Sequence, residues 1–402
     1  MPSHLWLPFT QMAEFDAGAR TFVAGSGTQL TDGLGRTLFD AISSVWVTVH
    51  GHGHPAIVDA IARQAARLDH ATALGASNPV AEELAERLTA LTGLDYAFFS
   101  SDGASAIEAA LKMAIGYWRN TDRPQRTKFA HLRASYHGDT TGAMSVSDIG
   151  AFKANYGAIT FSSIETDDLA AVLARDDVAA VIVEPTVQAA AGMRIVPAAW
   201  YAPLAEAHAP LLIVDEIATG FGRTGAMFAF TDLGLEPDLL CLGKGITGGT
   251  IALSATLAGA RVYDAFLGRS GDLRQFFHGH SYAANPIACA AALASLDLFD
   301  VERTLERVAE LDAVLDVVLA PLAASAHVRE IRRAGLMCGI ELETPASATF
   351  EPTYAWHVAN RMYDRGHFTR PIGDTIQLVP PLASDVSELR AFATELEEVL
   401  SA

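Results

Sequence analysis

Two short motifs hold the residues whose types and spacing are best suited to chemistry. In the first, Asp215 and Glu216 follow the apolar run 211–214. Such a run predicts a strand buried on both faces, and the carboxyl end of a buried strand is where open α/β sheets bind ligands. In the second, Lys244 lies between two glycines that leave room for a flat molecule beside the backbone. The acid and the lysine together predict pyridoxal phosphate (PLP) chemistry, in which the lysine forms a Schiff base and the acid pairs with the pyridinium nitrogen.

Each motif also has a simpler interpretation when it is taken alone. An Asp-Glu pair after a strand is often a helix N-cap, where the negative charge meets the helix dipole favourably. A Gly-Lys-Gly sequence is often a surface turn. A short motif is only a hypothesis until its surroundings support it, so the rest of the chain decides between these interpretations.

Three other places supply residues that suit the same cofactor. Gly103 and Ala104 lie in a small-residue turn between a predicted strand and a long predicted helix, where free backbone amides can bind a phosphate. An ordinary strand-to-helix loop has the same composition. Tyr136 and His137 follow another predicted strand, and either ring could stack on a flat cofactor or lie in the core. Glu184 ends a further run that is typical of a buried strand.

Three alternating histidines, His50, His52 and His54, raise the question of a zinc site. The intervening glycines and Pro55 favour a loop, and no cysteine or second histidine cluster has ligand spacing. We therefore predict no metal site.

Composition and charge narrow the classes of partner. The chain has 402 residues, 50% of them hydrophobic, and a formal net charge of −19. A polyanion is repelled by nucleic acids and by acidic membrane surfaces, so we expect neither as a partner. The first residues lack the pattern of a signal peptide, no apolar run is long enough to span a bilayer, and the three cysteines are widely spaced. The expected location is the cytoplasm.

Strands that alternate with helices must position the candidate residues. From residue 93 to 244 the pattern is strand, helix, strand, which predicts right-handed crossovers and a mainly parallel sheet. Residues 1–50 have the pattern of an aromatic arm and a β-meander, and residues 291–402 that of an α+β unit. We predict an α/β protein in which residues 51–290 form the large domain and the two flanking segments together form the smaller one.

With these residues assembled, the chain resembles the class III (ω-) aminotransferases, which are PLP-dependent transferases of fold type I. The resemblance rests on Asp215–Gly225 and Gly243–Gly245 and covers nearly the whole chain. It implies a large domain with a mainly parallel, seven-stranded-type sheet, PLP as cofactor, amine and carbonyl compounds as substrates, and a homodimer with shared active sites. Further motifs resemble the biotin-synthesis branch of the class. They are residues 5–10, 43–46, 50–55, 135–140 and 370–371.

The resemblance also implies roles for individual residues. Lys244 would form the Schiff base, and Asp215 would lie under the pyridine nitrogen. Gly103 and Ala104 would hold the phosphate through their amides, and Ser281 of the partner subunit would reach it across the dimer. The other residues expected at the cofactor are Tyr136, as the ring that stacks on it, His137, Glu184 and Ile217. The residues expected at the substrate are Phe9, Val45, Trp46, Tyr136, Gln377 and Arg370, the last as the group that receives a carboxylate.

Four positions depart from the pattern of the biotin-synthesis branch. Phe9, Val45 and Gln377 stand where that branch has a tyrosine, a tryptophan and a tyrosine, and Ala104 stands where it has a serine. The first three are expected to line the substrate pocket, whose groups set specificity. The predicted function is transfer of an amino group from a primary amine to a keto or aldehyde acceptor by a ping-pong mechanism, as in that branch. The alternative is an ω-amino acid or diamine transaminase with other substrates.

Three other functions compete with this prediction. A racemase or decarboxylase would use the same cofactor, but Arg370 and a pocket for two successive substrates favour transfer. A regulatory protein would bind the cofactor without turnover, yet the sequence has no appended DNA-binding motif. A nucleotide-binding enzyme would need a GxxxxGK[ST] loop, or a GxGxxG loop after the first strand, and the sequence has neither.

Overall fold

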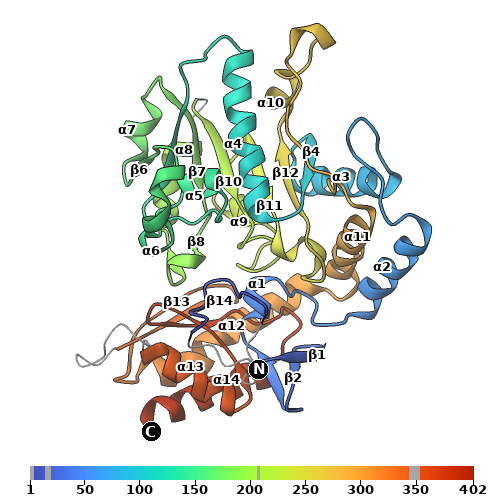
Figure 1. Ribbon diagram of the computed structural model, residues 1–402. Helices are drawn as coiled ribbons and strands as arrows, with labels where there is room; N and C mark the ends of the chain where they lie inside the picture. Colours follow the sequence, from blue (N-terminus) through green and yellow to red (C-terminus); the bar gives the residue numbers. More distant parts are fainter. Residues whose placement is uncertain (1–3, 14–19, 206–208, 344–353) are drawn as a thin grey trace.

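The computed structural model describes residues 4–13, 20–205, 209–343 and 354–402. Figure 1 shows two bodies. The upper one is built around a central sheet, and in the lower one the blue N-terminal strands lie beside the red C-terminal helices. The first strands and the last helices of the described chain therefore belong to the lower body.

A seven-stranded sheet with the order β4-β12-β11-β10-β7-β5-β6 organises the upper body. Strands β11, β10, β7, β5 and β6 are parallel to one another, whereas β12 pairs antiparallel with both β11 and β4. The predicted α/β fold of type I, with its mainly parallel sheet, is confirmed. The strands are β4 (Tyr96–Ser100), β5 (Lys128–Leu132), β6 (Ile164–Thr166), β7 (Val178–Val183), β10 (Leu211–Asp215), β11 (Leu239–Leu242) and β12 (Ser254–Ala258).

The apolar run that precedes the first motif forms β10, and all of its residues are buried. Leu211 and Ile213 pack in the apolar cluster that includes α4, while Leu212 and Val214 pack in the larger cluster on the opposite face. Side chains alternate across a strand, so both faces of β10 are covered. The carboxylate of Asp215 emerges at the end of the strand.

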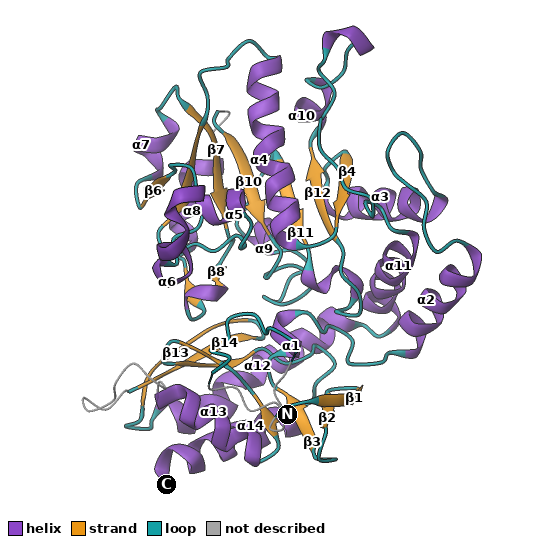
Figure 2. Cartoon of the chain, viewed as in Figure 1, coloured by secondary structure: helices purple, strands orange, loops and turns teal. Residues whose placement is uncertain are grey.

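Helices cover both faces of the central sheet (Figures 1 and 2). Three of them begin with proline, whose fixed φ suits the first helical position. The N-terminus of α4 is capped by Asp102, whose Oδ1 accepts a hydrogen bond from the amide of Ser105 at 2.9 Å. The helices are α2 (Pro55–Arg67), α3 (Pro79–Thr92), α4 (Gly103–Asn120), α5 (Thr141–Ser145), α6 (Gly150–Lys153), α7 (Leu169–Leu173), α8 (Ala198–Ala205), α9 (Ala229–Asp232), α10 (Ala260–Asp264) and α11 (Pro286–Val301).

Two further sheets and three long helices make up the lower body (Figure 2). One sheet has the order β13-β14-β17-β16, and the other has the order β1-β2-β3-β15. In the second, β15 pairs parallel with β3, with His367 opposite Phe39, so the N-terminal meander and the C-terminal segment share a sheet. The elements are β1 (Phe22–Ser26), β2 (Gln29–Asp32), β3 (Thr37–Asp40), β13 (Val328–Ala334), β14 (Met337–Leu342), β15 (His367–Phe368), β16 (Pro371–Ile372), β17 (Thr375–Leu378), α12 (Thr304–Ala323), α13 (Tyr354–Asp364) and α14 (Val386–Ser401).

The remaining short elements lie near the boundary of the two bodies. They are the turn labelled α1 (Ser43–Trp46) and the hairpin of β8 (Val187–Gln188) and β9 (Arg194–Ile195). Across the described ranges, no helix is long and apolar enough to cross a membrane.

Candidate active site

Asp215, Glu184 and Lys244 lie at one edge of the central sheet. Asp215 ends β10, Glu184 directly follows β7, and Lys244 comes shortly after β11. Because β7, β10 and β11 are parallel neighbours, their carboxyl ends meet at this edge. Open α/β sheets bind their ligands at such an edge, so the structure brings the two opening motifs together at a suitable place.

The carboxylate of Asp215 is held from two sides. Its Oδ2 lies 2.7 Å from Nδ1 of His137, and its Oδ1 accepts a hydrogen bond from the amide of Ile217 at 3.0 Å. A carboxylate only accepts, so Nδ1 of the imidazole carries the proton. Both side chains are buried, and His137 is fully enclosed behind the acid. Of the two rings that follow β5, Tyr136 is therefore the one that is partly exposed.

Glu184 supports the segment that carries Tyr136. Its Oε2 accepts a hydrogen bond from the amide of Tyr136 at 3.1 Å, and the phenol donates to Oδ2 of Asp139 at 2.9 Å. Burial, with the nearby charge of Asp215 as the second cause, raises the pKa of Glu184 well above its usual value. Glu184 is thus an enclosed carboxyl group beside Asp215.

Lys244 is half-buried in a strained backbone conformation. Its φ is 42°, in the left-handed region that non-glycine residues seldom adopt, and such strain often accompanies a functional position. The ammonium Nζ lies 4.8 Å from the centre of the Trp46 ring. Burial lowers the pKa of Lys244, against the opposing charges of Asp215 and Glu184. The surroundings therefore favour the neutral amine that can act as a nucleophile or a base.

The N-terminus of α4 points its first amides at the same region. A Cβ on Gly103 would lie 2.9 Å from Cγ2 of Ile217, and one on Gly243 would lie 3.2 Å from the same atom, so both glycines allow close packing around Ile217. Among the hydrogen bonds of the described residues, the amides of Gly103 and Ala104 donate to no acceptor. Free amides at a helix N-terminus suit a phosphate.

Gln377 of the lower body links Trp46 to the backbone of Arg370. The indole Nε1 of Trp46 donates to Oε1 of Gln377 at 2.7 Å, and Nε2 of Gln377 donates to the carbonyl of Arg370 at 2.7 Å. The half-buried guanidinium of Arg370 lies 6.0 Å from the ring centre of Trp356 and pairs with no carboxylate in the described part of the chain. It is thus a cation that can receive an anionic group.

Phe9 reaches the region through an aromatic contact that the sequence does not reveal. Its ring centre lies 5.0 Å from that of Phe152, and Phe152 lies 5.9 Å from Tyr136. Phe9 is 55% exposed and Val45 is 42% exposed. No motif marks Phe152, which lies in the short helix α6.

Ser281 does not join the other predicted residues within one chain. It lies exposed in the loop before α11, and no contact links it to Lys244, Asp215 or Gly103. Its neighbour His280 approaches the N-terminus of α4, with Nε2 at 3.4 Å from Oγ of Ser101.

The three alternating histidines serve three separate contacts. Nε2 of His50 lies 3.0 Å from the carbonyl of Ser295, Nε2 of His52 lies 2.8 Å from Asp40, and Nε2 of His54 lies 3.0 Å from Glu302. Among the residues that the structure describes, no group of histidine, cysteine and acidic side chains could hold a metal ion.

Comparison with known proteins identifies the family. The model of "Aminotransferase class-III" matches residues 16–400. The chain belongs to this family. An "Adenosylmethionine-8-amino-7-oxononanoate aminotransferase" of Anoxybacillus flavithermus is 39% identical across 99% of this chain and 95% of its own length. The protein of the same name from Aquifex aeolicus is 40% identical across 96% and 93%.

Solved structures agree with the sequence relatives. The adenosylmethionine-8-amino-7-oxononanoate aminotransferase of Methanocaldococcus jannaschii superposes with a TM-score of 0.94 at 35% identity, covering 99% of this chain and 97% of that one. An amine transaminase from an uncultivated Pseudomonas species, in a PLP-bound form, has a TM-score of 0.91 at 33% identity, covering 99% and 98%. The predicted class is confirmed, and three of these four relatives are named for the branch that the sequence motifs indicate.

Proposed function

We propose that this chain binds PLP at the described sheet edge and transfers an amino group from adenosylmethionine to the carbonyl carbon of 8-amino-7-oxononanoate, the reaction that its relatives are named for. The names of these relatives carry the two substrates, and one observation carries the cofactor and the chemistry. Asp215 and Lys244, at the ends of adjacent parallel strands, lie beside the acceptor-free amides of Gly103 and Ala104.

The residues present fit the proposed cofactor. The amides of Gly103 and Ala104 would hold its phosphate, Asp215 would pair with its pyridinium nitrogen, Lys244 would bond its aldehyde carbon, and Tyr136 would lie on its ring. The missing hydroxyl of Ala104 leaves the amides as donors. When bound, PLP supplies an electron sink for the pair of electrons left by proton removal.

Each of the protein's own groups then has a task. Asp215, oriented by His137 and by the amide of Ile217, is a fixed negative charge that would pair with the pyridinium nitrogen. Lys244, whose pKa is lowered by burial, would remove a proton from the substrate carbon that bears the amine and deliver it to the former aldehyde carbon of the cofactor, on the other side of the amine nitrogen. Arg370 binds a carboxylate through two parallel hydrogen bonds.

The two named substrates share the group that Arg370 would recognise. Adenosylmethionine is an amino acid and 8-amino-7-oxononanoate is a carboxylic acid, so each brings a carboxylate. One cation can hold both in turn, as a ping-pong cycle requires, since the donor product leaves before the acceptor binds.

An ω-amino acid or diamine transaminase is the second candidate. The observation that favours it is the set of altered pocket positions, Phe9, Val45 and Gln377. A curated "Omega-aminotransferase" of Caulobacter vibrioides is also similar, at 33% identity across 98% of this chain. The choice depends on which amine reacts.

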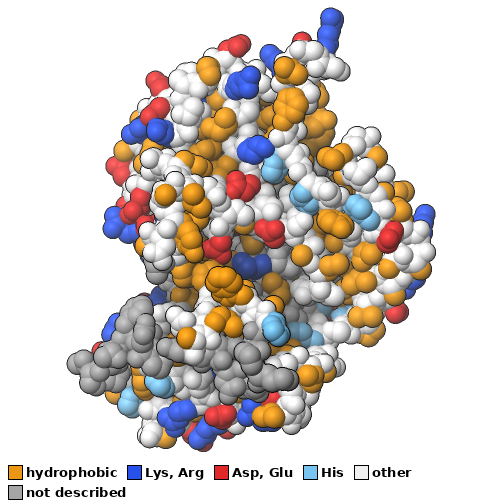
Figure 3. All heavy atoms as spheres, viewed as in Figure 1, with side chains coloured by type: hydrophobic (Ala, Val, Ile, Leu, Met, Phe, Trp, Pro, Cys, Tyr) orange, Lys and Arg blue, Asp and Glu red, His pale blue; other side chains and the backbone are white. Residues whose placement is uncertain are grey.

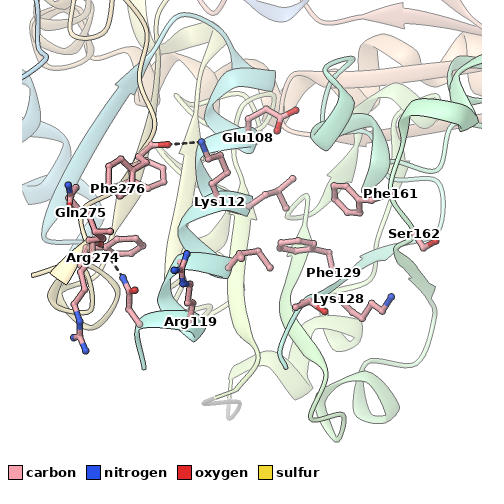
Figure 4. Close-up of a pocket in the computed structure, with 18 residues that line it drawn as sticks. Glu108, Lys112, Arg119, Lys128, Phe129, Phe161, Ser162, Arg274, Gln275 and Phe276 are labelled. Carbon is pink, nitrogen blue, oxygen red and sulfur yellow. Dashed lines mark hydrogen bonds between the residues drawn. The ribbon is translucent and has the colours of Figure 1, made fainter. Parts of the chain in front are cut away.

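We also propose that two copies share their sites through one face of the upper body. A groove of about 590 Å³ lies between α4 and the segment before α11, and Figure 4 shows Phe129, Phe161 and Phe276 along it. Leu273 and Phe277 nearby are each 63% exposed, and Figure 3 shows hydrophobic atoms and histidines gathered on this side. A second copy covering this face would bring Ser281 of the partner subunit toward Gly103. Sedimentation of Phe277→Asp should show loss of the dimer.

The cytoplasm is the proposed location. Cys241, Cys289 and Cys338 are free and buried, and free thiols suit a reducing compartment.

The test is a half-reaction with each amine alone. Purified enzyme loaded with PLP is mixed with adenosylmethionine, a diamine or an ω-amino acid, and the visible spectrum is followed. The proposal expects adenosylmethionine to convert the cofactor to its aminated form, with Lys244→Ala as the inert control. Conversion by a diamine but not by adenosylmethionine would favour the second candidate, and conversion by no amine would contradict both.

A further inference from the structure

The turn Ser43–Trp46 has an unusual backbone. Its four consecutive residues have φ values of 50°, 50°, 68° and 68°, all in the left-handed region, and none of them is glycine. Only glycine, and occasionally asparagine or aspartate, adopts this conformation routinely, and then as single residues. Val45, which is β-branched, is an especially poor match. Something outside the turn must therefore stabilise it.

Asp40 provides that support. Its side chain is completely buried, and its Oδ1 accepts a hydrogen bond from the amide of Ser44 at 3.0 Å. Its Oδ2 accepts one from the hydroxyl of Ser44 at 2.9 Å and lies 2.8 Å from Nε2 of His52. The carboxylate thus binds the turn at Ser44, and His52 fixes the carboxylate from the other side.

The turn determines where Trp46 lies. The hydroxyl of Ser43 donates to the carbonyl of Val379 at 2.6 Å, which attaches the start of the turn to the lower body. At its end, the Trp46 ring lies 4.8 Å from Nζ of Lys244 and its Nε1 donates to Gln377. Any relaxation of the turn toward ordinary φ values would move Trp46 relative to both groups.

We propose that Asp40 and His52 are positioning residues that hold the left-handed turn and thereby shape the substrate side of the site. Neither touches the reacting groups; they act through Ser44 on the placement of Trp46 and Val45. The effect on substrate binding rests on the proposed function, in which Lys244, beside the Trp46 ring, is the reacting lysine. A buried carboxylate of the meander, Asp40, thus becomes a determinant of substrate binding.

Two measurements on Asp40→Ala test the proposal. We expect about tenfold faster hydrogen exchange in the peptide that covers residues 41–49, because the Ser44 amide loses its acceptor and the turn opens locally. We also expect kcat/KM for the amine donor to fall about 100-fold, as a misplacement of about 1 Å can cause, while the visible band of the bound cofactor remains. Exchange does not depend on knowing the substrate.

A second substitution distinguishes strain from simple loss of contacts. In Asp40→Ala the hydroxyl of Ser44 has already lost its acceptor, and glycine adopts a left-handed φ without steric cost. The double variant Asp40→Ala/Ser44→Gly should therefore recover most of the lost kcat/KM, whereas exchange at residue 44 should stay fast because its amide still lacks the Asp40 acceptor. A purely structural role for Asp40 elsewhere in the fold would give no such rescue.

Asp32 offers a matched control. It is also a buried aspartate of the meander, and its carboxylate accepts hydrogen bonds from the amides of Leu34 and Arg36, each at 2.9 Å. It supports the hairpin between β2 and β3. Asp32→Ala should speed exchange in that hairpin and leave kcat/KM and the 41–49 peptide close to wild type.

The results that overturn the proposal are specific. Unchanged exchange in residues 41–49 of Asp40→Ala, or wild-type kcat/KM in an enzyme that does react, would contradict it.

If Asp40→Ala does not fold, His52→Ala replaces it. We expect its kcat/KM to fall by up to about tenfold, because one hydrogen bond is removed. His52→Gln, which keeps a donor for Asp40, should restore the loss, and failure of this pair contradicts the proposal. A wild-type enzyme that reacts with no amine refutes the proposed function and leaves the exchange test intact.

Discussion

The residues proposed to hold the cofactor come from the ends of neighbouring strands, whereas those proposed to hold the substrate come from segments far apart in the chain. Asp215 and Lys244 each lie at or just beyond a strand of one sheet, Asp215 buried and Lys244 half-buried. Trp46, Gln377 and Arg370 depend on a strained turn and on the lower body meeting the upper one. A change in the second group can therefore leave the first intact.

Because the two groups of residues are held by different parts of the structure, the fold can keep its chemistry while its substrate changes. The cofactor side is fixed by strands that the core already requires, so its geometry is inherited with the fold. The substrate side is fixed by a few polar contacts, and its members include Phe9 and Val45, which are half-exposed. We expect substitutions on the cofactor side to slow the reaction of every substrate. Substitutions on the substrate side should slow the reaction of some substrates and not of others.

The largest effect is expected for Lys244→Ala. Removal of the amine proposed to exchange protons with the substrate carbon should lower kcat by at least about 10⁴-fold for every amine, and abolish the visible band of the bound cofactor. Single-turnover spectra and steady-state rates measure both. Multiple turnovers of Lys244→Ala at an appreciable rate would contradict the proposed role of Lys244.

A somewhat smaller loss is expected for Asp215→Asn. The variant keeps the shape of the side chain and should retain PLP, but it removes a fixed charge, for which about 10² to 10³-fold in kcat is typical. His137→Asn should lose less, because the amide of Ile217 still orients the carboxylate. Near-normal rates in Asp215→Asn would show that its charge has no part in the reaction.

Arg370→Met should separate the two sides of the site. We expect KM for carboxylate-bearing donors to rise about 100-fold, since hydrogen bonds between charged groups are lost, while amines without a carboxylate react at the wild-type rate. The matched variant Arg365→Met removes a surface arginine that pairs with Glu395 and Glu398 and should change neither. Equal loss for both classes of donor would contradict the assigned role of Arg370.

The smallest effect concerns the support beneath Tyr136 and His137. Nδ1 of His131 lies 3.1 Å from Oγ of Ser135, and Nε2 lies 2.9 Å from Oγ of Ser163; burial lowers the pKa of His131 to about 4. The folded state keeps the ring neutral while the unfolded state takes up a proton below about pH 6.5. The stabilisation is complete above that pH and is lost as pH falls toward 4. The loss of unfolding free energy relative to neutral pH is about 2 kcal/mol at pH 5.

Denaturant unfolding of wild type and His131→Gln at pH 7 and pH 5 measures this effect. The wild-type protein should lose more stability on acidification than the variant does. His50 is a second such group, since burial lowers its pKa to about 4, so the variant should retain part of the pH dependence. Identical pH dependence in both proteins would contradict the assignment to His131.

Much of the cofactor side can be predicted from the sequence, because buried strands and the motifs at their ends are local patterns. The run 211–214 and the helix that starts at Gly103 are examples. Strand β12 is not indicated, because its residues Ser254–Ala258 are mostly small and lack a clear strand pattern. Asp215 and His137 are separately recognisable, yet their contact is a product of the fold.

The substrate side is less predictable because its contacts join distant residues. Trp46 and Gln377 are 331 positions apart, and no local pattern pairs them. The left-handed turn is equally hidden, since Ser-Ser-Val-Trp has no glycine to signal it. Asp40 and His52 are ordinary residues of a meander and a loop until the fold brings them together at Ser44.

The most direct test of the account is to locate the cofactor on the chain. The PLP-loaded enzyme is treated with borohydride, which reduces a carbon–nitrogen double bond between cofactor and lysine, and is then digested and analysed by mass spectrometry. We expect the added mass on Lys244 alone, in a protein of four lysines. A label on another lysine, or none in an enzyme that binds PLP and reacts with amines, would contradict it.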